Sequence, residues 1–106
     1  MAVPTLSPAE ARARLAEPDP PLLLDCREPF EFAVCRLPGA VLIPLGELAE
    51  RVDEVDSGRA VLVYCHHGVR SINAVVILQA LGFRAAHIRG GIDAWSREVD
   101  PGVPRY

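Results

Sequence analysis

The sequence contains no lysine, and it lacks the features of a chain that binds nucleic acid or crosses a membrane. All eleven basic residues are arginines that stand singly along the chain, and the formal net charge is −3, so no basic run follows a phosphate backbone. No apolar run approaches the length of about 20 residues that a transmembrane helix needs. The N-terminal stretch has early proline and acidic residues where a signal peptide needs an apolar core. We therefore expect a cytoplasmic protein that binds neither nucleic acid nor membranes.

Low-complexity tracts and internal repeats are also absent. Of the 106 residues, 50% are apolar and 24% are charged, which is the composition of an ordinary globular domain. A chain of this length holds one hydrophobic core rather than two independent ones. We predict a single domain over residues 1–106.

Short apolar runs alternate with helical patterns along the chain. The apolar runs predict strands at residues 22–25, 40–43, 60–64 and 85–88, and the segments between them predict helices at 8–16, 45–52, 71–81 and 92–99. Strands that are apolar throughout and alternate with helices are typical of a parallel sheet that is covered on both faces. We predict an α/β fold with a central, mostly parallel sheet of four to five strands and helices on both faces.

Cysteine is scarce, and one of the three cysteines occupies a position suited to chemistry. Cys26, Cys35 and Cys65 form no C-x-x-C pair, and an odd count without an export signal indicates reduced thiols. Cys65 ends the apolar run at 60–64 and precedes the loop that leads into the helix at 71–81, where free backbone N–H groups and the positive end of the helix favour a thiolate. Gly68 permits the tight turn that lets these N–H groups converge on the sulfur, and Arg70 adds positive charge nearby.

Two other interpretations of Cys65 compete with this one. A free cysteine at the end of a strand is often an inert buried residue. A metal site made of Cys65, His66 and His67 would need adjacent loop residues to point at one ion, and the sequence offers no further ligand at a typical spacing. We therefore expect no metal, and we expect His87 to be a packed or edge residue of its strand rather than a ligand.

Three segments together resemble the rhodanese-like domain family. The segments LLLDCREPFEFAVCRLPGAVLIP, VLVYCHHGVRS and GFRAAHIRGGIDAWSREV are spread from residue 22 to residue 99. The matching positions are Asp25 and Arg27 of a D-x-R motif, Glu28, Pro29 and Glu31 at a helix start, Pro38, Gly39 and Ala40 in a turn, Cys65 as the catalytic cysteine, and Gly90, Gly91, Ala94 and Trp95 of the closing motif.

The resemblance implies a three-layer fold and a sulfurtransferase. Cys65 would take a sulfane sulfur from thiosulfate or a persulfide donor, hold it as a persulfide, and pass it to a thiophilic acceptor, which is cyanide in vitro and a thiol or a protein in the cell. This is a ping-pong covalent mechanism that needs no cofactor. The active-site loop and its flanks would comprise His66, His67, Gly68, Val69, Arg70 and Ser71.

Further roles follow from the chemistry of the residues. Arg70 is expected to attract the anionic donor, and His66 and His67 to line the entrance and tune donor choice. Asp25 and Arg27 are expected to form an ion pair that braces neighbouring loops, although a position of Arg27 facing the pocket stays open.

Two alternative functions remain. A cysteine phosphatase or arsenate reductase uses C-x5-R, whereas only four residues separate Cys65 from Arg70, which makes the loop tighter than a phosphoryl group requires. The second alternative is a catalytically idle module that only binds a partner.

Cys26 lies at the same sheet edge as Cys65, which suggests a disulfide after oxidation, although a buried, inert Cys26 is the commoner case. Cys35, in a turn, is expected to be exposed.

Overall fold

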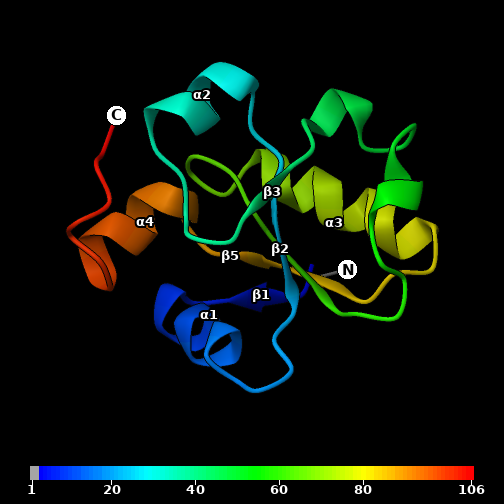
Figure 1. Ribbon diagram of the computed structural model, residues 1–106, viewed down its shortest axis with the longest axis horizontal. Coiled ribbons are helices and arrows are strands. Elements are labelled where there is room, and N and C mark those ends of the chain that lie inside the picture. The colour runs from blue at the N-terminus through cyan, green and yellow to red at the C-terminus, as the bar shows by residue number, and fades with distance from the viewer. Residues whose placement is uncertain (1–2) are drawn as a thin grey trace.

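The computed structural model describes residues 3–106 and contains a five-stranded parallel sheet (Figure 1). The strands are β1 (Thr5–Leu6), β2 (Leu22–Asp25), β3 (Val41–Leu42), β4 (Val61–Tyr64) and β5 (Ala85–Ile88). Their spatial order is β1-β5-β4-β2-β3, and every neighbouring pair is parallel. The predicted α/β class is confirmed.

Four α-helices connect or follow the strands. They are α1 (Pro8–Leu15), α2 (Pro29–Val34), α3 (Arg70–Ala80) and α4 (Gly91–Glu98). The start of α1 is set by a reciprocal cap, because the Ser7 hydroxyl accepts from the Glu10 N–H at 3.1 Å while the Glu10 carboxylate accepts from the Ser7 N–H at 2.8 Å. The predicted helices at 8–16, 71–81 and 92–99 are confirmed to within one residue at each end.

Alternate residues of the central strands feed two separate cores, one on each face of the sheet. Val61 and Val63 of β4 pack beneath α3, whereas Leu62 and Tyr64 pack beneath α1 and α4. In Figure 1, α3 lies on one side of the sheet and α1 and α4 lie on the other. The expected three layers are therefore present.

Two segments of the chain have a secondary structure that differs from the predictions. The predicted helix at 45–52 is replaced by two short 3-10 helices, Leu45–Glu47 and Val52–Glu54. Gly46 weakens the first turn of any longer helix, and the segment is anchored in the core by Leu48 and Val55, which are separated by an irregular turn. In addition, no sequence pattern predicted β1, because the strand is only two residues long and depends on pairing with β5.

The topology marks one place in the sheet where ligands are expected. From β2 the chain passes through α2 to β3, whereas from β4 it passes through α3 to β5 on the opposite side. The carboxyl ends of β2 and β4 therefore flank a topological switch point, which is where open parallel sheets bind their ligands. Cys26 and Cys65 directly follow these two strands. Among residues 3–106, no helix has both the length and the apolar character of a membrane span.

Candidate active site

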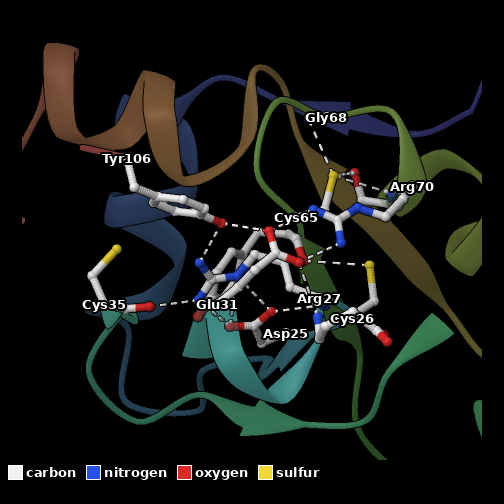
Figure 2. A network of polar contacts seen from close by, with 12 residues as sticks. Asp25, Cys26, Arg27, Glu31, Cys35, Cys65, Gly68, Arg70 and Tyr106 are labelled. Carbon is white, nitrogen blue, oxygen red and sulfur yellow. Dashed lines mark hydrogen bonds and ion pairs between the residues drawn. The ribbon is translucent and has the colours of Figure 1, made fainter. Parts of the chain in front are cut away.

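Cys65 is the first residue of the loop between β4 and α3, and its sulfur is surrounded by hydrogen-bonding groups. The residue is 1% exposed, and its Sγ accepts from the backbone N–H of Gly68 at 3.1 Å and of Ser71 at 3.3 Å. The hydroxyl of Ser71 lies 3.4 Å from the same sulfur. Figure 2 shows the contact between Gly68 and the Cys65 sulfur. The convergence of N–H groups predicted from Gly68 and the helix start is present.

The shape of this loop requires glycine at position 68. The φ angle of Gly68 is +93°, and a Cβ atom there would lie 2.9 Å from the backbone nitrogen of Gly90. Both conditions exclude an ordinary side chain, since a positive φ is strained and the backbone of Gly90 has no room to move aside.

The N-terminus of α4 holds the loop from the other side. The N–H of Ile92 donates to the Cys65 carbonyl at 2.9 Å, and the N–H of Asp93 donates to the His66 carbonyl at 3.1 Å. A Cβ atom on Gly91 would overlap these carbonyl groups. The two hydrogen bonds thus hold the backbone of Cys65 and His66 against α4, and the absence of a side chain at Gly91 permits this close approach.

These contacts make Cys65 a strong acid for a thiol. The Cys65 pKa is lowered to about 4 by the adjacent Cys26 thiol, the hydroxyl and N–H of Ser71 and the N–H of Gly68. Together these groups outweigh the effect of burial, which raises the pKa. The neighbouring Cys65 and burial raise the pKa of Cys26 instead, and the Cys26 thiol donates to the Tyr64 carbonyl at 3.5 Å. At neutral pH the site therefore holds a Cys65 thiolate beside a Cys26 thiol, and the thiolate is the nucleophilic form.

Arg70 makes a bidentate ion pair across the loop. Its two terminal nitrogens lie 2.6 and 2.8 Å from the carboxylate oxygens of Glu31 on α2. The Glu31 pKa is lowered to about 2, mainly by Arg70 and further by Tyr106 and the backbone N–H of Glu28, although burial acts in the opposite direction. The guanidinium charge is thus compensated by α2, which makes the pair a brace between α2 and the start of α3. The attraction of an anionic donor by Arg70 stays a prediction.

Asp25 and Arg27 form the predicted ion pair, and both residues are 0% exposed. Arg27 also donates to the Cys35 carbonyl at 2.6 Å and to the Tyr106 hydroxyl at 2.7 Å. That hydroxyl donates in turn to Glu31 at 2.7 Å. Figure 2 shows the resulting chain of polar contacts, which runs from the end of β2 to the brace beside the cysteine loop. Arg27 is enclosed by protein groups rather than open to solvent.

The two loop histidines lie at the surface of the site. The His66 ring stacks between His67 and Tyr106, with centroid distances of 3.8 Å on both sides. Burial and the neighbouring His67 lower the His66 pKa. His67 and Val69 are exposed. Their place at an entrance and their effect on donor choice both stay predictions.

One cluster in the described part of the chain has the residue types of a metal site. Ligand atoms of His66, His67 and Asp93 lie within 4.8 Å of one another. However, the two carboxylate oxygens of Asp93 are bound to Arg105 at 2.8 Å and to Arg97 at 3.1 Å. Two cations on the only anionic ligand oppose a metal ion, so this donor set does not fit one. Cys65 itself is not part of the cluster.

Some features of the site were not expected from the sequence. Cys35 is 8% exposed rather than exposed, because it ends α2 and its thiol packs against the Pro104 carbonyl at 3.3 Å; the prediction for Cys35 was wrong. Tyr106 also gave no signal, since its role depends on how the C-terminal residues fold back over α2. His87 contacts Ser71 at 2.9 Å, and a polar residue within an otherwise apolar strand was a signal available in the sequence.

Both a family model and a curated relative match most of this chain. Residues 7–98 match the family described as the Rhodanese-like domain. The chain is 39% identical over 89 residues to the protein of Allochromatium vinosum named Sulfurtransferase, and the match covers 83% of both chains.

Other similarities extend over most of this chain. It is 34% identical over 105 residues to the probable adenylyltransferase/sulfurtransferase MoeZ of Mycobacterium tuberculosis, which covers 96% of this chain but only 27% of that protein. The crystal structure of a rhodanese-related protein from Thermoplasma volcanium superimposes with a TM-score of 0.85 at 30% identity, covering 97% of this chain and 99% of that one. The fold is thus shared with that structure over 97% of this chain, and both of the relatives named above carry the word sulfurtransferase in their names.

Proposed function

Because this chain belongs to the rhodanese-like domain family, we propose that it transfers a sulfane sulfur through a persulfide on Cys65. The donor is thiosulfate or a persulfide, and the acceptor is a thiol or a protein, or cyanide in vitro. The observation that carries the proposal is the Cys65 sulfur with its low pKa, held by the N–H groups of Gly68 and Ser71 at 3.1 and 3.3 Å.

The first half-reaction charges the cysteine. The Cys65 thiolate attacks the outer sulfur of thiosulfate, a new S–S bond forms, and the S–S bond of the donor breaks with its electron pair leaving on sulfite. The product is a persulfide anion. In this proposal the N–H groups of Gly68 and Ser71, which contact the Cys65 sulfur, also stabilise the persulfide anion formed on it.

The second half-reaction discharges it. An acceptor thiolate attacks the outer sulfur, the Cys65 S–S bond breaks, and its electron pair returns to Cys65 as thiolate while the acceptor leaves as a persulfide. Cyanide in place of the thiolate gives thiocyanate. No proton needs to be supplied to Cys65 in either step, which suits a cysteine that stays ionised at neutral pH.

The geometry argues against the phosphatase alternative. A phosphoryl group would need several loop N–H groups and an arginine directed at its oxygens, whereas both terminal nitrogens of Arg70 are occupied by Glu31. The low pKa of Cys65 also argues against an idle binding module, since such a module gains nothing from a thiolate that is held by three donor groups.

The experiment is an intact mass measurement after mixing the protein with thiosulfate. We expect the gain of one sulfur, its loss on addition of cyanide, and no gain in Cys65→Ser. Cys35→Ser is the matched control, because Cys35 is a buried thiol outside the loop, and it should charge as the wild type does. If neither thiosulfate nor a low-molecular-weight persulfide charges the wild type, the proposal fails and the binding module becomes the better description.

A further inference from the structure

His87 reaches the nucleophile through Ser71. Nδ1 of His87, in the middle of β5, lies 2.9 Å from the Ser71 hydroxyl oxygen, which lies 3.4 Å from the Cys65 sulfur. Ser71 is 0% exposed and His87 is 5% exposed. Cys65 after β4, Ser71 of α3 and His87 of β5 thus form a buried chain of hydrogen-bonding groups that ends on the Cys65 sulfur.

The direction of this chain depends on the charge of Cys65. A hydroxyl has one proton to donate. A Cys65 thiol donates to the Ser71 oxygen, whereas a thiolate can only accept, so in the thiolate form the two groups are hydrogen-bonded only when the Ser71 proton points at the sulfur. The Ser71 oxygen can then only accept from His87, which requires a proton on Nδ1. If Nδ1 lacked that proton, it would compete with the sulfur for the only proton of Ser71.

We propose that His87 is a positioning residue that carries its proton on Nδ1 and thereby fixes the Ser71 hydroxyl as a donor to the Cys65 sulfur. It acts on the thiolate and on the Cys65-bound sulfur of the persulfide without touching the substrate. The part of the inference that concerns the persulfide rests on the proposed function, whereas the part that concerns the thiolate does not.

The surroundings of the chain agree with a neutral His87. Burial lowers its pKa, and the Cys65 charge opposes this, so the imidazole supplies an oriented N–H rather than a full positive charge. Cys26, which follows β2, and Arg70 of α3 also interact with Cys65. Arg70 is compensated by Glu31 of α2.

The test is the pH dependence of alkylation of Cys65 by iodoacetamide, followed on the Cys65 peptide by mass spectrometry so that Cys26 and Cys35 stay in place, and it reports the thiolate fraction of Cys65. We expect His87→Leu and Ser71→Ala each to raise the apparent pKa by about one unit, because one hydrogen bond to a charged group is worth about this much. Alkylation below both apparent pKa values would then slow about tenfold. His87→Asn, whose amide can donate from near the position of Nδ1, should restore most of the wild-type value.

The double variant separates positioning from a general structural effect. If His87 acts through Ser71, His87→Leu should change the apparent pKa little once Ser71 is alanine. An equal rise in both backgrounds, or no rise in either single variant, would overturn the proposal.

A second measurement needs no substitution at His87. The 15N chemical shifts of its ring in the wild-type protein at neutral pH should show a protonated Nδ1, and a ring protonated only on Nε2 would overturn the proposal even if the variants failed to fold. Both measurements are independent of sulfur transfer. A protein that shows the coupling but is never charged by a sulfur donor would refute the proposed function and leave this inference standing.

Discussion

Replacing Glu31 by glutamine tests the brace between α2 and the active-site loop. The glutamine keeps the size of the side chain and can still accept from the Tyr106 hydroxyl, but it loses the charge that holds both terminal nitrogens of Arg70. We expect Glu31→Gln to destabilise the protein at neutral pH and to loosen the start of α3, where the donors to Cys65 are located.

The magnitude follows from the position of the carboxylate. The gap between the ordinary pKa of 4.5 and the value of about 2 in the fold corresponds to ~3 kcal/mol at ~1.4 kcal/mol per pKa unit. Glu31 is 5% exposed, but the Arg70 side chain is 34% exposed and regains water when the pair is lost. We therefore expect a loss of about 2 kcal/mol in the free energy of unfolding.

The assay is urea unfolding followed by circular dichroism over a series of pH values. Because the Glu31 pKa is lower in the folded state than in the unfolded state, its stabilisation is complete above pH of about 4.5 and is lost as the pH falls towards 2. The difference between wild type and variant should shrink over the same interval.

A matched control distinguishes this brace from a surface ion pair. Glu54 also pairs with an arginine, Arg51, but both side chains are well exposed, so Glu54→Gln should change the free energy of unfolding little. Equal losses in the two variants, or a Glu31→Gln difference that does not depend on pH, would refute the reasoning.

Three more predictions concern the surroundings of Cys65. Gly68→Ala should lower the free energy of unfolding by more than ~1 kcal/mol, because of the φ of +93° and the contact with the Gly90 nitrogen, and it should raise the Cys65 pKa. Urea unfolding measures the first effect and alkylation kinetics the second. A variant as stable as the wild type contradicts the first effect. Tyr106→Phe removes the hydroxyl between Arg27 and Glu31 and should cost about 1 kcal/mol without changing Cys65 alkylation; an altered alkylation rate would show that the tail acts on the nucleophile. Mild peroxide should convert Cys65 to a sulfenic acid that condenses with the Cys26 thiol, releasing water and leaving a disulfide; peptide mass spectrometry that finds no Cys26–Cys65 link in the wild type contradicts this.

Local sequence patterns determined most of the secondary structure. The cap at Ser7, the apolar run of β4 and the glycine after α3 are local signals, and the elements they predict are present. The helix predicted at residues 45–52 is absent, because there a local pattern was overruled by packing. Its apolar spacing resembles that of a helix, but Leu48 and Val55 are drawn separately into the core beneath the sheet, and tertiary packing overrides weak local propensity.

The sequence by itself was enough to propose Cys65 as the nucleophile, because a cysteine at the end of a buried strand, a glycine three residues later and a helix start shortly after are all close together along the chain. Only the tertiary structure decided what surrounds it. Glu31, His87 and Tyr106 come from three distant segments, and their contacts with Arg70, Ser71 and Arg27 arise only when the strand order brings these segments to one edge. Local patterns specify backbone conformation, whereas the partners of buried polar groups are specified by packing, because each such group must find a hydrogen bond somewhere in the folded chain.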